Sequence, residues 1–142
     1  MDKKELISTI RTYLEKREGL VFACIHGSFV TSDRFRDIDL AIYGSPKPTL
    51  MDIGAMITDL SVLTGFKIDI TLLNDLQNNS PELAFNIVSY GELLFCTDTT
   101  LHTTYKTGVL LNYFDTAYLR DMVEKAFHER METGNFGKQS NL

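Results

Sequence analysis

The stretch LVFACIHGSFVTSDRFRDIDLAIYG, residues 20–44, decides the fold of this chain. Its first part, residues 20–26, is a continuous apolar run rich in strand-forming side chains, which predicts a buried β-strand. Gly27 and Ser28 interrupt that run. After a further eight residues, residues 37–44 alternate polar and apolar side chains, which predicts a second strand with one buried face. We therefore expect two strands linked through a glycine turn at the centre of the protein.

Two aspartates, Asp37 and Asp39, stand at the start of the second predicted strand. Residues two apart on a strand point to the same face, so their like charges repel each other. A divalent cation between them removes this conflict, and ligands that are all oxygen favour Mg²⁺ or Mn²⁺ over zinc. Asp69 is the acidic exception in a third predicted strand, residues 66–73. If the second and third strands are neighbours, the three carboxylates can hold two metal ions, the arrangement used for in-line displacement at phosphorus.

Gly27 and Ser28 suit a phosphate site beside these aspartates. Glycine permits a sharp turn and lets a phosphate approach the backbone closely. A short helix beginning at Ser28 would add backbone N–H groups and a hydroxyl to an anion site. The order of strand, Gly-Ser turn, helix, strand with two aspartates and strand with a third aspartate therefore predicts phosphoryl or nucleotidyl transfer.

The remaining segments predict a small α/β domain followed by a helical tail. Residues 92–97 suit either a short fourth strand or an extended link, and residues 134–142 are expected to fray. The segment from Leu101 to Met131 has a helical pattern, in one piece or two, and its tyrosines could form either a partner surface or plain packing. Capping residues and apolar periodicity predict the other helices, over 2–18, 50–64 and 81–91.

Composition narrows the class of protein. A length of 142 residues suits one domain, and a formal net charge of −5 argues against a general nucleic-acid coat, although a nucleotide whose phosphates are carried by metal ions remains compatible. The only cysteines, Cys24 and Cys96, lie in apolar runs and are expected to be buried free thiols. The sequence shows neither a secretory signal nor a long apolar span, so a cytoplasmic protein without a membrane anchor is expected.

At these residues the sequence resembles the minimal nucleotidyltransferases of the DNA polymerase beta superfamily. The resemblance rests on Gly27-Ser28, on the pair Asp37 and Asp39, and on the later Asp69. The C-terminal segment LLNYFDTAYLRDMVEKAFHERM is also similar to that of stand-alone members, the MntA-like antitoxins of HEPN/MNT toxin–antitoxin systems. The resemblance covers nearly the whole chain.

The resemblance implies a single nucleotidyltransferase domain over residues 1–142, with a catalytic core at 1–98 and C-terminal helices at 99–133. It implies a small mixed sheet flanked by helices, and transfer of AMP from ATP, with two Mg²⁺ ions, to a tyrosine hydroxyl of a HEPN-domain toxin. It also implies that Asp37, Asp39 and Asp69 are the catalytic and metal-binding residues. Gly27 and Ser28 would bind the nucleotide, and antitoxin and toxin would form a hetero-oligomer.

The sequence departs from the family pattern in the eight-residue spacer FVTSDRFR, which is shorter than expected, and in Arg36, which stands where the family usually has serine. Two alternatives therefore stay open: an antitoxin of weak or no activity that neutralises its partner by contact, and a nucleotidyltransferase acting on a small aminoglycoside-type acceptor. His26 could contact the nucleotide or be structural. Arg34 and Arg36 could neutralise phosphate charge or be solvated loop residues.

Overall fold

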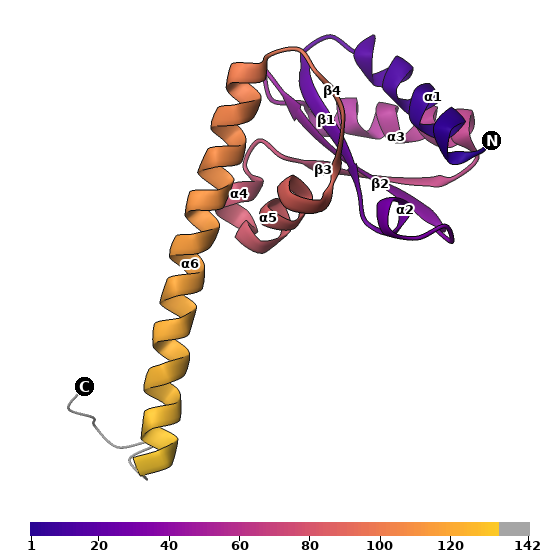
Figure 1. The fold of residues 1–142 in the computed structure, drawn as a ribbon. Coiled ribbons are helices and arrows are strands. Elements are labelled where there is room, and N and C mark those ends of the chain that lie inside the picture. The colour runs from indigo at the N-terminus through magenta and orange to yellow at the C-terminus, as the bar shows by residue number, and fades with distance from the viewer. Residues whose placement is uncertain (134–142) are drawn as a thin grey trace.

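The computed structural model describes residues 1–133 and contains one sheet with helices on both of its faces (Figure 1). A long C-terminal helix runs along one side and then projects away from the rest of the molecule (Figure 1). The elements in chain order are α1 (Lys3–Glu15), β1 (Leu20–His26), α2 (Ser28–Thr31), β2 (Asp37–Gly44), α3 (Leu50–Thr64), β3 (Lys67–Leu72), α4 (Leu76–Asn79), α5 (Pro81–Tyr90), β4 (Glu92–Cys96) and α6 (Thr99–Thr133).

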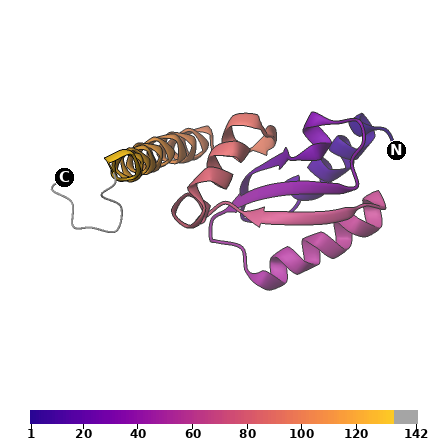
Figure 2. The same cartoon turned by 90° about the horizontal axis from the view of Figure 1, so that it is seen from below.

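The sheet has four strands in the order β3-β2-β1-β4. β1 is antiparallel to both β2 and β4, whereas β2 and β3 are parallel neighbours. In Figure 2, β2 and β3 run side by side, with α3 beside β3. The predicted fold class, a small mixed sheet flanked by helices, is confirmed. Residues 92–97 could have formed either a strand or an extended link, and the structure shows that Glu92–Cys96 form the edge strand β4.

The structure settles two features of the helices that the sequence pattern did not predict. The C-terminal segment is one continuous helix of 35 residues, α6, and not two pieces. The four-residue helix α4 was not expected, because an element this short is below the length at which apolar periodicity can be recognised. The expectation that residues 134–142 fray lies outside the described residues.

Local signals place the helices as expected. The Asp2 side chain accepts a hydrogen bond from the backbone N–H of Glu5 at the start of α1. Thr49 and Asp52 form a reciprocal capping box at the start of α3. That helix ends at Gly65, whose φ of 76° is left-handed and suits glycine. These caps act within a few residues, which is why the sequence alone located the elements.

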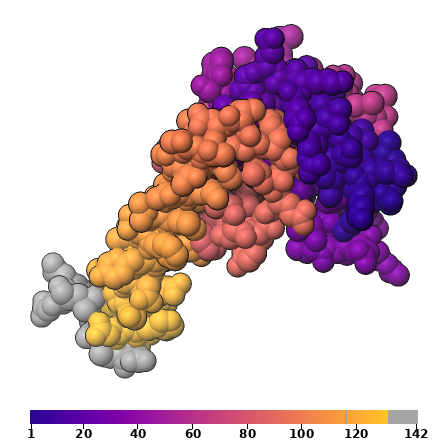
Figure 3. All heavy atoms as spheres, turned by 45° about the horizontal axis from the view of Figure 1, so that its top comes forward, coloured from indigo at the N-terminus to yellow at the C-terminus, as the bar shows by residue number. Residues whose placement is uncertain are grey.

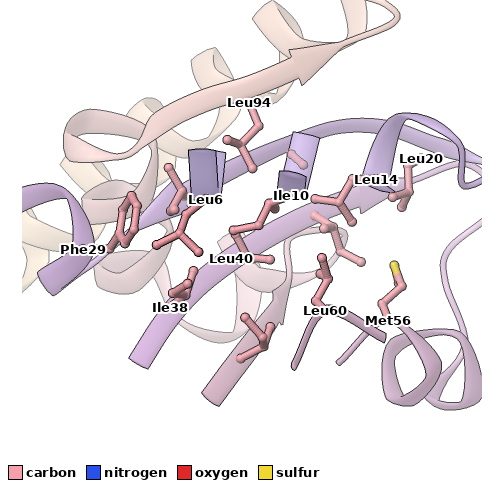
Figure 4. Close-up of a cluster of buried hydrophobic side chains, with 14 residues drawn as sticks. Leu6, Ile10, Leu14, Leu20, Phe29, Ile38, Leu40, Met56, Leu60 and Leu94 are labelled. Atoms are coloured by element: carbon pink, nitrogen blue, oxygen red, sulfur yellow. The ribbon is translucent and has the colours of Figure 1, made fainter. Parts of the chain in front are cut away.

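One face of the sheet packs against α1 and α3 and forms the larger core (Figure 4). Helix α1 contributes Leu6, Ile10 and Leu14, whose spacing forms a single apolar stripe. On β2 the alternate residues Ile38, Leu40 and Ile42 point into this core, as the sequence predicts. The buried members are Leu6, Ile10, Leu14, Leu20, Ala23, Ile25, Phe29, Ile38, Leu40, Ile42, Met56, Leu60, Ile68 and Leu94.

The opposite face packs against α4, α5 and the first half of α6. The Phe22 ring lies 5.1 Å from the Tyr43 ring and 5.6 Å from the Tyr105 ring, measured between centroids. The Tyr105 hydroxyl donates a hydrogen bond of 2.7 Å to the Leu73 carbonyl, and this fixes α6 to the end of β3. The buried residues of this smaller cluster are Phe22, Cys24, Ala41, Leu73, Ala84, Ile87, Tyr105 and Val109.

Both cysteines are free thiols, as expected, but only Cys24 is buried, since Cys96 is partly exposed. Burial raises the pKa of the Cys24 thiol to about 11, so this thiol stays protonated near neutral pH. In the part of the chain that the structure describes, no helix combines the length and apolar character needed to cross a bilayer.

Candidate active site

The three predicted aspartates lie on the adjacent parallel strands β2 and β3. Asp39 is directly opposite Asp69 in the strand register, and Asp37 is opposite Lys67. Neighbouring strands run about 4.8 Å apart, so the Asp39 and Asp69 backbones are as close as two residues on different strands can be. The sequence alone could not show that the second and third strands are neighbours, and the structure shows that they are.

These aspartates stand on the face of the sheet that carries α5 and α6. The neighbours Ile38 and Ile68 are buried in the opposite core, and strand alternation sends Asp37, Asp39 and Asp69 the other way. The helices on this face pack over residues at the far ends of the strands, such as Ala41 and Leu73. Asp37 and Asp39 are consequently half-buried and Asp69 is exposed, which leaves them within reach of a substrate.

Gly27 is packed against the carboxylate of Asp39. Its φ of 76° and ψ of −153° belong to a backbone region that residues other than glycine essentially never adopt. A Cβ atom at this position would lie 2.4 Å from Oδ2 of Asp39. The four-residue helix α2 follows at once, beginning at Ser28. The turn therefore brings the backbone of Gly27 against Asp39, and Ser28, which is exposed, follows it directly.

His26 lies beside Asp39 across the β1–β2 pairing. Burial lowers the pKa of His26 below its usual value, although the Asp39 charge and a hydrogen bond to the Leu40 backbone oppose this. Its Nε2 atom is buried without a hydrogen-bond partner among the described residues. These observations favour a neutral imidazole beside Asp39.

The donor set fits a hard divalent cation. Carboxylate oxygens are the ligands that Mg²⁺ prefers, and because Gly27 has no Cβ, the Asp39 carboxylate can lie directly against the backbone of the turn. Among residues 1–133, however, no group of three or more His, Cys, Asp or Glu side chains is already gathered closely enough to hold a metal. The site is therefore not a preformed cage, and Asp37, Asp39 and Asp69 would have to turn their side chains toward a shared ion.

Arg34 and Arg36, the two cations of the spacer, are exposed in the loop between α2 and β2. Their exposure is compatible with either of the roles considered for them. Another hollow, of about 170 Å³, is lined by residues that include Leu20 and Pro46. It lies at the opposite ends of β1 and β2 from the aspartates, and so it does not belong to this site.

Lys3 is a residue of this region that the sequence did not reveal. Its Nζ atom donates hydrogen bonds to the backbone carbonyls of Phe29, at 2.5 Å, and Ser32, at 2.7 Å. The ammonium also lies over the rings of Phe29 and Phe35, 5.1 and 5.5 Å from their centroids. Lys3 thereby ties the start of α1 to α2 and the loop after it. No local pattern could indicate a contact across so many residues.

We expect Lys3→Met to lower the free energy of unfolding by about 1–3 kcal/mol, because two charge-assisted hydrogen bonds are lost and a partly buried carbonyl is left without its donor. Urea denaturation of both proteins measures this difference. Lys4→Met, at an exposed position on the same helix, is the control and should stay close to wild type. Equal stabilities of the two variants would show that Lys3 does not anchor α2.

Comparison with known proteins agrees with this geometry. The family model described as "Polymerase beta, Nucleotidyltransferase" matches residues 8–100, which include Gly27, Ser28, Asp37, Asp39 and Asp69. The chain belongs to this nucleotidyltransferase family. A comparison with curated proteins gave no significant match.

Solved structures of antitoxins share the fold of this family member. A tri-AMPylated HEPN toxin of Shewanella oneidensis in complex with its MNT antitoxin matches with a TM-score of 0.68 and 15% identity, over 89% of this chain and 98% of that one. A toxin–antitoxin with AMP-PNP matches with a TM-score of 0.61 and 16% identity, over 92% and 99%. A MntA–HepT structure matches with a TM-score of 0.56 and 15% identity, over 91% and 96%. At these identities the likeness establishes the fold.

Proposed function

We propose that this nucleotidyltransferase moves AMP from ATP to a tyrosine hydroxyl of a HEPN-domain toxin, and so acts as its antitoxin. The observation that carries the proposal is the direct opposition of Asp39 and Asp69 on parallel strands, with Gly27 packed against the Asp39 carboxylate. An acidic cluster next to a glycine turn suits a metal-bound triphosphate. Such a reaction would take place in the cytoplasm, where both ATP and the partner would be available.

Each residue has a defined task in this proposal. Asp37 and Asp39 would bind both Mg²⁺ ions, and Asp69 would bind the one nearer the acceptor. Bound Mg²⁺ neutralises phosphate charge and lowers the pKa of the attacking hydroxyl. Gly27 and Ser28 would seat the β and γ phosphates.

The transfer is a displacement at the α-phosphorus of ATP. The tyrosine oxygen forms the new bond to phosphorus, and the bond to the bridging oxygen of the β-phosphate breaks. Pyrophosphate leaves with the electron pair of that bond, and Asp69 helps to remove the hydroxyl proton. In this proposal the protein mainly positions groups and stabilises charge, as is general for phosphoryl transfer.

The similar solved structures support the chemical class of substrate and acceptor. One contains a HEPN toxin that carries AMP groups, and another contains the ATP analogue AMP-PNP. The family match provides the transferase assignment independently of these structures. Together they favour a protein acceptor and an adenine nucleotide for this chain.

The proposal predicts that removal of divalent metal abolishes the transfer. Incubation with ATP, Mg²⁺ and a HEPN-domain partner protein should place AMP on a tyrosine, detected by intact-mass and peptide mass spectrometry. Chelation with EDTA should reduce this product to background, and added Mg²⁺ should restore it, because the carboxylates alone cannot neutralise the triphosphate. Full modification in the presence of EDTA would refute the metal dependence.

Neutralisation by contact alone is the second candidate. The short eight-residue spacer between Ser28 and Asp37 and the lack of a preformed three-ligand group within residues 1–133 favour it. Under this alternative, a variant without the aspartates would still protect cells from the toxin. Cell survival with that variant therefore separates the two functions.

A further inference from the structure

Helix α6 has two halves with different surroundings. Its first half packs on the sheet, where Tyr105 and Val109 are buried. The Tyr113 ring then stacks on the Phe85 ring of α5 at 4.0 Å between centroids, and Arg120 forms an ion pair with Glu82. The second half extends beyond the body of the molecule (Figures 1 and 3).

This projecting half is unusually apolar for an exposed helix. Seven large apolar side chains between positions 111 and 131, here termed the α6 apolar surface, are each 50–69% exposed. Together they present on the order of 800 Å², which is what one partner contributes to a standard protein interface. A monomer rarely leaves such an area in water without a function. The residues are Leu111, Phe114, Tyr118, Leu119, Met122, Val123 and Met131.

The spacing of these residues indicates the shape of the partner. Leu111, Phe114, Tyr118 and Met122 follow one another at three- and four-residue intervals, which places them in one stripe along the helix. Leu119 and Val123 lie beside this stripe and make it broader than the narrow seam of a coiled coil. A broad apolar stripe on a helix is best covered by helices packed alongside it.

The placement of α6 on the sheet indicates where a bound partner lies relative to the aspartates. The first half of α6 and α5 cover the same face of the sheet that carries Asp37, Asp39 and Asp69. An open hollow of about 510 Å³, lined by residues of α5 and by Arg120, adjoins the projecting half. A protein seated there would lie on the same face of the sheet as the aspartates.

The solved antitoxin structures share this part of the fold. The match to the toxin–antitoxin with AMP-PNP covers 92% of this chain, which leaves outside far fewer residues than the 35 of α6. The projecting helix is therefore part of the fold of antitoxins that were solved with their toxins. This favours a toxin-like acceptor over a second copy of this chain.

We propose that the α6 apolar surface is the docking site of the protein acceptor, an α-helical partner whose own apolar face packs against residues 111–131. Docking there holds the acceptor on the aspartate-bearing face of the sheet. This inference rests on the proposed function for the identity of the partner, but it concerns binding and not the chemical step.

The test is a Tyr118→Glu/Met122→Glu double variant. Both side chains are exposed, 66% and 50%, so the change should not disturb folding. We expect at least a 100-fold rise in the Kd for the HEPN-domain partner protein, measured by calorimetry, with a matching loss of AMP transfer at low partner concentration. Binding of AMP-PNP should stay unchanged.

Met51→Glu/Val62→Glu is the matched control. These residues are 86% and 80% exposed on α3, on the opposite face of the sheet, and we expect wild-type affinity for the same partner. An unchanged Kd in the α6 variant, or no binding by the wild-type chain, would overturn the docking site. So would a wild-type homodimer that the α6 variant converts to a monomer without affecting partner binding.

The same measurements distinguish failure of the proposed function from failure of the docking site. If the wild-type chain binds the HEPN-domain protein without transferring AMP, and the α6 variant still abolishes binding, the chemistry is wrong and the docking site is supported. If transfer occurs and the α6 variant retains both transfer and affinity, the docking site alone is wrong.

Discussion

Replacing Asp37 and Asp39 together with asparagine is expected to reduce AMP transfer at least ~1,000-fold without loss of the fold. Asparagine keeps the shape of the side chain but removes the negative charge that, in the proposed mechanism, holds the metal ions. The expected loss corresponds to about 4 kcal/mol of transition-state stabilisation, within what metal-assisted charge neutralisation contributes. Stability should be unchanged or slightly higher, because two like charges on one strand face no longer repel each other.

Transfer from α-labelled ATP to the HEPN-domain protein measures the activity, and circular dichroism with thermal unfolding measures the fold. Asp59→Asn is the control, because Asp59 lies on α3, accepts a hydrogen bond from Tyr13, and is remote from the site. It should transfer AMP at the wild-type rate. A double variant that retains wild-type transfer would refute the role of the acidic pair.

Gly27→Ala is expected to abolish detectable nucleotide binding and to destabilise the protein by about 1–3 kcal/mol. The backbone at Gly27 has a conformation that alanine adopts only with strain. The added Cβ would also lie 2.4 Å from Oδ2 of Asp39, so either the turn or the carboxylate must move. In both cases the glycine turn and the aspartate no longer meet in the arrangement that the proposed triphosphate site requires.

Calorimetric titration with AMP-PNP and Mg²⁺, together with urea denaturation, checks both parts of this prediction. Gly54→Ala provides a matched control, since a Cβ at this helical position meets nothing within 4 Å. It should bind normally and be more stable by roughly 0.5–1 kcal/mol, because alanine favours a helix interior over glycine. Normal nucleotide affinity in Gly27→Ala would show that the turn does not form the phosphate site.

The sequence predicted the strand faces and the turn on which the candidate site residues lie, because the signals for these are local. Alternation along residues 37–44 assigned Asp37 and Asp39 to the face opposite Ile38 and Leu40, and burial confirms this assignment. The glycine at the end of β1 was identified as a turn residue from its place in the pattern. Its second constraint, the contact with Asp39, depends on a strand pairing that no single segment encodes.

Lys3 and α6 illustrate the opposite case. Lys3 lies in an ordinary N-terminal helix, and only packing of α1 against the sheet brings its ammonium to the carbonyls of α2. The helical pattern after Leu101 was clear, but whether its apolar residues face the core or water could not be read from spacing. The structure divides them, with Tyr105 buried and Tyr118 exposed.

The sequence by itself determined the order of the elements apart from α4 and β4, the helix caps and the faces of the strands, because hydrogen-bonded caps and side-chain alternation act over a few residues. Only the tertiary structure decided that β2 and β3 are parallel neighbours, with Asp39 opposite Asp69. It also decided that half of α6 stands free of the sheet. Strand register and helix docking depend on contacts between segments distant in the chain, and these form only when apolar faces from several elements are buried together.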